Sequence, residues 1–250
     1  MKGIILAGDS GSRLHPLTLG MPKQLLPIYD KPMIYYPIET LVHSGINDIL
    51  IITTREYQPL FQKTLGDGNL FNAKFKYAIQ EHANGIAQAI NIATDFIGKD
   101  SMCLITGDMI IAGDGVKNHI AKAIKAVEKS GNATIFVENK SYPDQYGRVV
   151  MGTGKKVERI VGETVAQYFY SIASFYVFPN SVIKYANKVE LSERGRYEIT
   201  DINKRFFEDC KLQVQVLDRN CTWFDTNTFD NLLTVAEYFR QLRKIQKYTQ

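Results

Sequence analysis

The stretch KGIILAGDSGSRLHPLTLGMPK, from Lys2 to Lys23, decides the fold that we expect for this chain. Residues 2–7 form a short apolar run typical of a buried strand, which passes without a linker into the Gly- and Ser-rich turn 8–13. Such a turn exposes backbone N–H groups, and the basic side chains of Arg13 and Lys23 add positive charge. We therefore predict a binding site for a polyphosphate directly after the first strand.

The turn matches neither of two common nucleotide-binding patterns. A Walker loop needs G-x-x-x-x-G-K-[ST], and the dinucleotide fingerprint G-x-G-x-x-G needs a third glycine where Arg13 stands. The mismatch argues against a nicotinamide oxidoreductase. A nucleotide, if one binds, must be held in another way.

The composition favours one domain with a large core. The chain has 250 residues, 45% of them hydrophobic, and we expect a single domain over 1–250. Its 30 basic and 26 acidic residues are too evenly mixed to predict a nucleic-acid surface. Three cysteines without metal-like spacing and no long apolar segment favour a soluble, cytoplasmic protein with no membrane partner.

Strands and helices alternate in the first half. Helical patterns at 32–43, 56–65, 85–96 and 116–129 separate apolar strands at 2–7, 48–53, 74–80, 101–106 and 133–137. This alternation predicts an open, mostly parallel α/β sheet with helices on both faces, whose ligands lie beyond the carboxyl ends of the strands. Arg13, Gln80 and Asp108 all fall at such ends.

The second half has a different pattern. Strand-like runs at 146–151, 156–161 and 167–178 follow one another with few helical signals, which predicts a small antiparallel lobe on the acceptor side. The remaining segments are expected to form helices and one strand, namely helices 179–189 and 198–209, strand 212–217 and a terminal helix 230–248.

Several motifs occur in a fixed order: LAGDSGSRL at 6–14, PKQLLPIYDKPMIYYPIETL at 22–41, QEHANGIAQA at 80–89, SERGRYEITDIN at 192–203 and WFDT at 223–226. In these motifs the chain resembles the sugar-phosphate nucleotidyltransferases, and most closely the short form of the bacterial glucose-1-phosphate thymidylyltransferases. The resemblance implies a Rossmann-like nucleotidyltransferase fold, in which 1–140 is the nucleotide-binding half and 141–250 the acceptor-binding and metal-ligand half of the single domain. It also implies Mg²⁺-dependent transfer of a nucleoside monophosphate from a nucleoside triphosphate to a sugar 1-phosphate with release of pyrophosphate, and commonly a homo-oligomer.

The resemblance carries over to charged residues of this sequence. Arg13 and Lys23 match the catalytic positions that neutralise the triphosphate and the leaving pyrophosphate, which an electrostatically catalysed transfer requires. Asp108 in TGDM and Asp225 in WFDT match the metal ligands, and two carboxylates can hold a hard cation through oxygen.

Other positions are expected to hold the nucleotide and the acceptor. The Gln80 amide can match the imide edge of thymine or uracil, which favours dTTP or UTP, and Gly85 is expected to leave room for the base. The other nucleotide-binding candidates are Leu6, Ala7, Gly8, Ser10, Gly11 and Ser12, and the acceptor-binding candidates are Gly147 and Tyr170.

Four positions depart from the family pattern. Asp9 replaces a glycine and places a carboxylate beside the expected triphosphate, where like charges weaken binding. Met109 replaces an asparagine, and Asn227 replaces a glycine in a mild change, because Asn tolerates left-handed geometry. The segment 161–163 reads Val-Gly-Glu instead of the Glu-Lys-Pro that binds the sugar phosphate, and Lys155 or Lys156 is a candidate substitute for the lysine.

The departures gather at the acceptor positions, whereas the metal, triphosphate and base positions are largely retained. Two interpretations follow. The chain is an active nucleotidyltransferase with an altered phosphorylated acceptor, or it is a catalytically impaired homologue that binds a nucleotide or nucleotide-sugar and regulates a partner.

Overall fold

The centre of the protein is a mixed β-sheet, seen in a computed structural model that describes residues 1–139, 147–152, 157–161 and 169–248. Its parallel part has the order β6-β1-β4-β5, formed by Met102–Thr106, Lys2–Ala7, Asp48–Thr53 and Lys74–Ile79. The register places Ile5 of β1 beside Ile51 and Ile105. The predicted parallel α/β opening is therefore confirmed.

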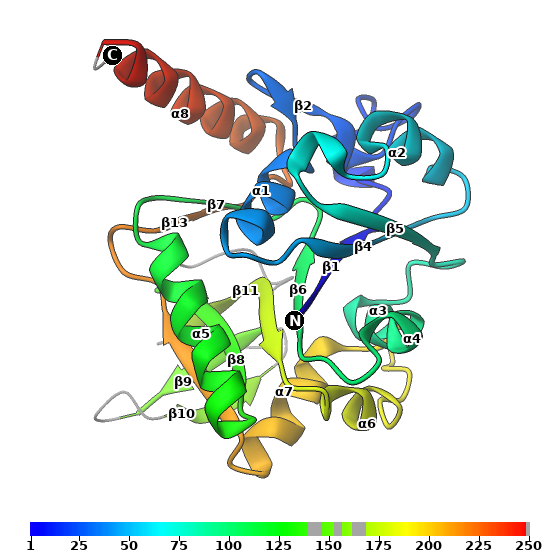
Figure 1. The fold of residues 1–250 in the computed structure, drawn as a ribbon, viewed down its shortest axis with the longest axis vertical. Helices are drawn as coiled ribbons and strands as arrows, with labels where there is room; N and C mark the ends of the chain where they lie inside the picture. Colours follow the sequence, from blue (N-terminus) through cyan, green and yellow to red (C-terminus); the bar gives the residue numbers. More distant parts are fainter. Residues whose placement is uncertain (140–146, 153–156, 162–168, 249–250) are drawn as a thin grey trace.

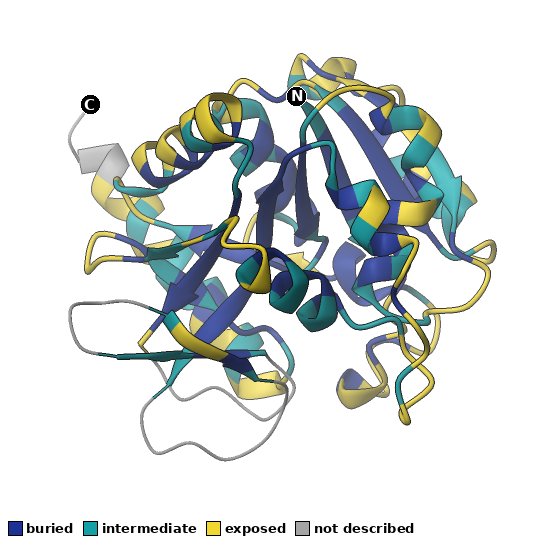
Figure 2. Cartoon of the chain, turned by 90° about the horizontal axis from the view of Figure 1, so that it is seen from below, coloured by how far each residue is buried: buried dark blue, intermediate teal, exposed yellow. Residues whose placement is uncertain are grey.

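Helices cover both faces of the sheet because its strands are apolar on both sides (Figures 1 and 2). One face packs against α1 (Tyr35–His43), α2 (Gln58–Leu65) and α5 (Val116–Ser130). The other packs against α3 (Ile86–Ile92), α4 (Thr94–Ile97), α6 (Val182–Ala186) and α7 (Ile199–Glu208). Neighbouring residues of β1 serve opposite faces, since Ile5 belongs to the first core and Ile4 to the second.

The antiparallel strands of the second half continue the main sheet. Strand β11 (Tyr170–Phe178) runs antiparallel to β6 and also pairs with β8 (Ala133–Glu138) and β9 (Arg148–Met151). At the edges, β10 (Val157–Val161) pairs with β9, and β12 (Leu212–Val216) lies parallel to β8. The antiparallel part is confirmed, although the first residues expected in each of its strands lie outside the described residues.

Two short ribbons were not predicted from the sequence. Strand β7 (Ile110–Ala112) pairs antiparallel with β13 (Thr222–Phe224), and β2 (Pro27–Ile28) pairs with β3 (Lys31–Pro32). Strands of two or three residues give no periodic pattern along the chain. The first ribbon, called here the β7–β13 ribbon, joins the segment after Asp108 to the segment before Asp225.

Several helix boundaries differ from those expected. Helix α1 begins at Tyr35, because Pro32 belongs to β3, and the helix expected at 85–96 is divided into α3 and α4 at Ala93. The helix expected at 179–189 is limited to α6. The long C-terminal helix, α8 (Phe229–Tyr248), extends from the body of the protein (Figure 1).

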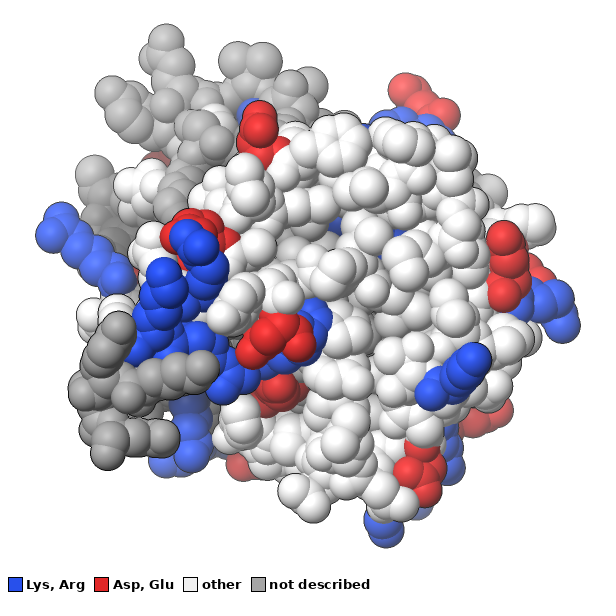
Figure 3. Space-filling model, turned by 90° about the horizontal axis from the view of Figure 1, so that it is seen from above, with Lys and Arg blue, Asp and Glu red and all other residues white. Residues whose placement is uncertain are grey.

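Helix α8 is fixed at its first half by a small apolar cluster. Val235 is buried with Ile28, Met33, Tyr36 and Ile110. Towards the end of the helix, basic side chains gather on the surface, while much of the face shown in Figure 3 is uncharged. Among the described helices, none combines the length and the apolar character needed to cross a membrane.

Candidate active site

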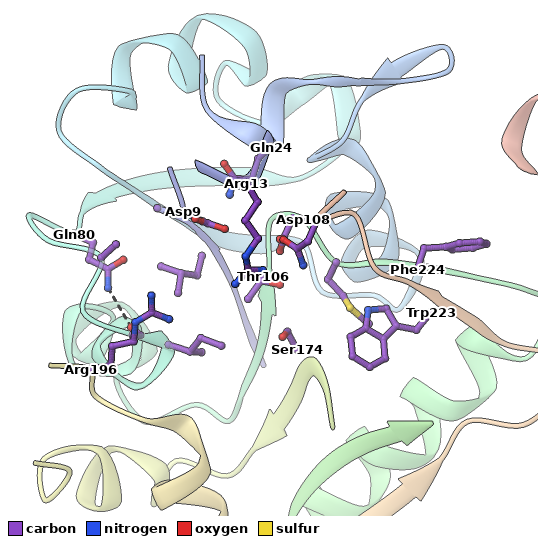
Figure 4. A pocket seen from close by; sticks show the side chains of 17 residues that line it. Asp9, Arg13, Gln24, Gln80, Thr106, Asp108, Ser174, Arg196, Trp223 and Phe224 are labelled. Carbon is purple, nitrogen blue, oxygen red and sulfur yellow. Dashed lines mark hydrogen bonds between the residues drawn. The ribbon is translucent and has the colours of Figure 1, made fainter. Parts of the chain in front are cut away.

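A pocket opens beyond the carboxyl ends of β1, β5 and β6, where the sequence predicted ligand binding. The strands contribute Leu6 and Thr106 and the turns that follow them contribute the polar side chains (Figure 4). Among the described residues, the lining consists of Leu6, Gly8, Asp9, Arg13, Gln24, Gln80, Ala83, Gly85, Ile86, Thr106, Asp108, Met109, Ser174, Arg196, Trp223, Phe224 and Asn227.

The pocket brings together six of the predicted site residues, which are Leu6, Gly8, Arg13, Gln80, Gly85 and Asp108. The others are not part of its lining. Lys23 and Asp225 lie behind it and contact residues that line it. The remaining positions are Ala7, Ser10, Gly11, Ser12, Gly147 and Tyr170.

These remaining positions differ in their surroundings. Ala7 and Gly11 are buried, whereas Ser10 and Ser12 are exposed on the turn. A Cβ atom on Gly11 would come within 2.8 Å of Lys23 Cβ, so this glycine allows the turn to pack on Lys23. Gly147 lies against Thr200, and Tyr170 pairs with Val149 in the sheet. The expected acceptor role of Gly147 and Tyr170 stays a prediction.

A hydrogen-bonded network connects the two predicted metal ligands. The buried Lys23 ammonium donates to Asp108 Oδ2 at 2.6 Å and to Asn227 Oδ1 at 2.8 Å. The Asn227 side chain in turn donates to Asp225 Oδ1, and the Asn227 backbone N–H donates to the same oxygen at 3.1 Å. The network thus runs from Asp108 through Lys23 and Asn227 to Asp225.

The substitution at Asn227 is more consequential than the sequence suggested. Its backbone is not among the non-glycine residues with positive φ, so tolerance of left-handed geometry is not the reason that asparagine fits here. The side-chain amide instead accepts from Lys23 and donates to Asp225, which no glycine can do. The view of this change as mild was therefore wrong.

The charge on Lys23 controls the ionisation of Asp108. Burial opposes the charged form of this carboxylate, but the ammonium and hydrogen bond of Lys23 outweigh that effect. The pKa of Asp108 consequently lies below its usual value of 3.8, and the carboxylate is ionised at neutral pH.

The turn after β1 contains a carboxylate that already uses one backbone donor. Asp9 Oδ1 accepts a hydrogen bond from the Gly11 N–H at 3.1 Å, and Asp9 lines the pocket beside Arg13. Figure 4 shows the Arg13 side chain between Asp9 and Asp108. The turn therefore offers the exposed guanidinium of Arg13 to a phosphate. The Gly11 N–H, which was expected to be free for a phosphate, is instead occupied by Asp9.

Gln80 is held in one orientation by its own amide group. The side chain is buried, and Nε2 donates to Gln88 Oε1 at 2.7 Å and to Gly85 O at 3.2 Å. Both N–H bonds are thus used inside the protein, and Oε1 is left as an acceptor. A Cβ atom on Gly8 would lie 2.8 Å from this oxygen, so Gly8 makes room for the Gln80 carboxamide.

Gly85 has a structural requirement that was not predicted. Its φ is +103°, and a Cβ atom there would lie 2.4 Å from the backbone oxygen of Tyr197. The absence of a side chain thus permits α3 to approach the 191–197 segment, in addition to any room it leaves for a base.

Several residues of the lining were not predicted from the sequence. Arg196 enters below Gln80, and Ser174 and Trp223 enter from β11 and β13 (Figure 4). Gln24 is 1% exposed, and its Oε1 has no hydrogen-bond partner among the described residues. Gln24 and Arg196 both belong to motifs recognised in the sequence, and this membership was the only signal that could have identified them.

The structure describes some of the positions that depart from the family pattern. Met109 lines the pocket and is buried, so a thioether occupies part of the wall. Val161 ends β10, whereas Gly162, Glu163, Lys155 and Lys156 lie outside the described residues.

The donor set suits a hard divalent cation. Asp108 and Asp225 supply carboxylate oxygens, the ligands that Mg²⁺ prefers, and the network described above holds both side chains in place. The Lys23 ammonium already balances one of these charges, so a cation would share Asp108 with Lys23.

Comparison with known proteins gives the class to which this fold and pocket belong. The family model described as "Nucleotidyl transferase" matches residues 2–241, and the chain belongs to this family. Its relatives include glucose-1-phosphate thymidylyltransferases from Mycolicibacterium smegmatis (42% identical, covering 97% of this chain and 83% of the relative) and Neisseria meningitidis serogroup A (39%, covering 98% and 85%).

Solved structures show the same architecture. A putative glucose-1-phosphate thymidylyltransferase from Bacillus anthracis, in complex with a sucrose, has a TM-score of 0.86 and 32% identity, with 95% of this chain and 94% of that chain covered. A UDP-glucose pyrophosphorylase complexed with UDP-glucose has a TM-score of 0.83 at 17% identity, covers 96% and 98%, and shows the fold alone. The chain is thus a nucleotidyltransferase of the thymidylyltransferase-like type, with the Rossmann-like fold of these proteins.

Proposed function

We propose that this nucleotidyltransferase transfers a nucleoside monophosphate from dTTP or UTP to a sugar 1-phosphate or a similar phosphorylated acceptor, with Mg²⁺ as the metal and pyrophosphate as the second product. The observation that carries the proposal is the network that joins Asp108 and Asp225 through Lys23 and Asn227 at the wall of the pocket. The names of the relatives support the same reaction.

The base preference rests on the Gln80 carboxamide. Its Oε1 is the free group and can only accept, so it suits the N–H of a thymine or uracil imide. Cytosine presents an acceptor at the equivalent ring nitrogen and would leave two acceptors facing each other. We therefore propose that CTP is a poor substrate, whereas the pocket wall gives no reason to separate dTTP from UTP.

Charge neutralisation would come from two arginines, Arg13 and Arg196, and from the metal site. Arg13 enters the pocket from the turn after β1 and is placed to pair with the triphosphate, and Lys23 keeps Asp108 ionised. Asp108 and Asp225 would hold Mg²⁺, which supplies Lewis-acid stabilisation of the transferring phosphoryl group when bound.

The acceptor phosphate requires a cation that the missing lysine of the family pattern does not provide. Arg196 lines the pocket, and within the described part of the chain its guanidinium has no protein partner. We propose that Arg196 binds the acceptor phosphate. The nucleotide-binding and acceptor-binding halves and the homo-oligomer belong to the same proposal, since they rest on the family resemblance, and so does the cytoplasmic location, which rests on the composition.

A second candidate function is favoured by Asp9. This carboxylate occupies the Gly11 N–H and lies beside the guanidinium expected to meet the triphosphate, so it opposes binding of an anion. A catalytically impaired protein that binds a nucleotide-sugar and regulates a partner would tolerate such a residue.

The deciding experiment measures pyrophosphate release with Mg²⁺ and dTTP, UTP or CTP over a panel of sugar 1-phosphates and non-sugar phosphates. Turnover with dTTP or UTP supports the transfer reaction, and the acceptor that works identifies the substrate. Micromolar binding of dTTP without turnover on any acceptor would favour the regulatory function.

A further inference from the structure

A second cluster of chemistry-bearing side chains lies outside the pocket. His119 on α5 faces Asp218 and Cys221 of the turn that leads into β13. Each residue offers one potential ligand atom, and these three atoms lie within 4.8 Å of one another. They are an imidazole nitrogen, a carboxylate oxygen and the thiol sulfur. This cluster has no signature in the sequence, because His119 and Asp218 are 99 residues apart along the chain.

The geometry of the cluster fits a single small cation. His119 Nε2 and Asp218 Oδ2 are 3.1 Å apart, close to the distance of about 3.4 Å between two ligands of a tetrahedral zinc ion. His119 and Cys221 are buried, whereas the Asp218 side chain is 55% exposed and gives access from solvent. Two buried ligands with one exposed ligand are typical of a three-residue site that keeps a fourth position for water.

The surroundings hold these groups in place. Gln215 Nε2 lies 2.7 Å from His119 Nδ1, so the carboxamide fixes the ring and, once turned, can accept the Nδ1 proton as a metal-bound imidazole requires. A Cβ atom on Gly115 would lie 2.8 Å from Cys221 Sγ, so the glycine allows the thiol to approach α5. Asp218 Oδ1 accepts from the Asn220 N–H at 2.9 Å, which leaves Oδ2 directed at His119.

The Cys221 thiol is not activated as a nucleophile. Burial and the neighbouring carboxylates of Asp218 and Glu138 raise the pKa of the Cys221 thiol to about 11. A thiol in such surroundings is a poor nucleophile at neutral pH. The same negative surroundings attract a divalent cation, which would stabilise the thiolate directly.

We propose that His119, Asp218 and Cys221 form a binding site for a zinc-type divalent cation, separate from the Mg²⁺ site of the pocket. The combination of imidazole, thiolate and carboxylate suits a borderline-soft metal, not the hard cation that Asp108 and Asp225 suit. The bound metal clamps α5 to the turn before β13. Because β13 carries Trp223 and Phe224 into the pocket wall, this clamp stabilises one side of the active site.

For the test, the protein is first freed of metal with a chelator and dialysed. It is then titrated with CoCl₂, and its melting temperature is measured with and without ZnCl₂. We expect one equivalent of cobalt to give a thiolate-to-cobalt charge-transfer band, and excess ZnCl₂ to raise the melting temperature by about 5 °C. Cys221→Ser should remove the band, and His119→Gln should weaken cobalt binding at least tenfold.

Matched controls separate this site from other places where a metal can bind. Cys210→Ser removes an exposed thiol, whereas Asp108→Asn removes a carboxylate of the pocket. Neither variant should change the thiolate-to-cobalt band. Far-ultraviolet circular dichroism without metal confirms that each variant is folded, and His119→Gln keeps the test valid should Cys221→Ser not fold. The proposal is overturned by a wild type that gives no thiolate band, or by a band that survives in Cys221→Ser or disappears in Cys210→Ser.

Discussion

The Lys23 ammonium lies 2.6 Å from Asp108 Oδ2, where Lys23 begins a short 3-10 helix, Lys23–Leu25, and Asp108 follows β6. Lys23 is fully buried, so this ion pair joins the core of the protein to the pocket in which Asp108 is partly exposed. We therefore expect stability and activity to depend on the same two side chains.

Removing one member of this pair should be costly. Asp108→Asn leaves the buried Lys23 charge poorly compensated, and we expect the free energy of unfolding to fall by about 3 kcal/mol and pyrophosphate release to fall by about 100-fold or more. Urea unfolding and a pyrophosphate assay measure the two effects. Asp114→Asn is the matched control, because Asp114 is exposed and does not line the pocket.

A double variant separates charge from packing. In Lys23→Met/Asp108→Asn no buried charge remains uncompensated, so more than half of the lost stability should return while activity stays absent. A double variant as unstable as the sum of the single variants would show that the two residues act independently.

The ion pair also predicts a pH dependence. Because the pKa of Asp108 is lowered in the folded protein, its contribution to stability is complete above the usual value of 3.8 and is lost as the pH falls through the lower folded value. The stability advantage of the wild type over Lys23→Met should therefore be largest near neutral pH and should shrink as the pH falls towards and below about 4, since burial without Lys23 favours the protonated carboxyl in the variant. Urea unfolding of both proteins at each pH tests this, and an advantage that grows on acidification would contradict it.

Asp9 should weaken nucleotide binding. Asp9→Gly removes the negative charge and releases the Gly11 N–H, so we expect dTTP to bind about fivefold more tightly, which corresponds to about 1 kcal/mol. Asp9→Asn removes the charge but can keep the hydrogen bond, and it separates the two causes. Calorimetric titration with dTTP gives the affinities, and a weaker affinity in both variants would assign Asp9 a positive role in binding.

Arg196 should act on the acceptor alone. Arg196→Ala is expected to raise the KM for the phosphorylated acceptor about tenfold, because a charge-assisted phosphate contact is lost, with little change in KM for the triphosphate. Arg159→Ala, on the exposed face of β10, is the control. An equal rise in both KM values would place Arg196 at the nucleotide instead.

Asn227 should stabilise the protein through the hydrogen bonds of its side-chain amide and not through its backbone conformation. Asn227→Ala and Asn227→Gly both remove its bonds to Lys23 and Asp225, so each should lower the free energy of unfolding by roughly 1–3 kcal/mol. Thermal melting of the two variants provides the check. A stable glycine variant beside an unstable alanine variant would show that backbone geometry is the decisive factor.

The fold was predictable from the sequence because its strands and longer helices have clear periods. The segment 48–53 reads as a buried strand, 74–80 as an alternating strand, and α5 and α8 as helices, since each is long enough to show its pattern. The β7–β13 ribbon was missed because each strand has three residues and pairing across the chain leaves no local signal.

The pocket was only half predictable for a related reason. Strand ends identified Arg13, Gln80 and Asp108, but the direction of each donor depends on tertiary contacts that motifs do not describe. The occupied amide of Gln80 and the bridging amide of Asn227 are examples, because their partners lie elsewhere in the fold.

The register of the β7–β13 ribbon makes loop length a functional variable. Ile110 faces Phe224, so Asp108 lies two residues before a paired position and Asp225 one residue after it. A one-residue slip would move one carboxylate by about 3.3 Å relative to the other, which exceeds the length of a magnesium–oxygen bond. Apart from Asp218 and Cys221, the turn at 218–221 should therefore tolerate changes of side chain far better than insertions or deletions, even though it contributes no side chain to the pocket lining.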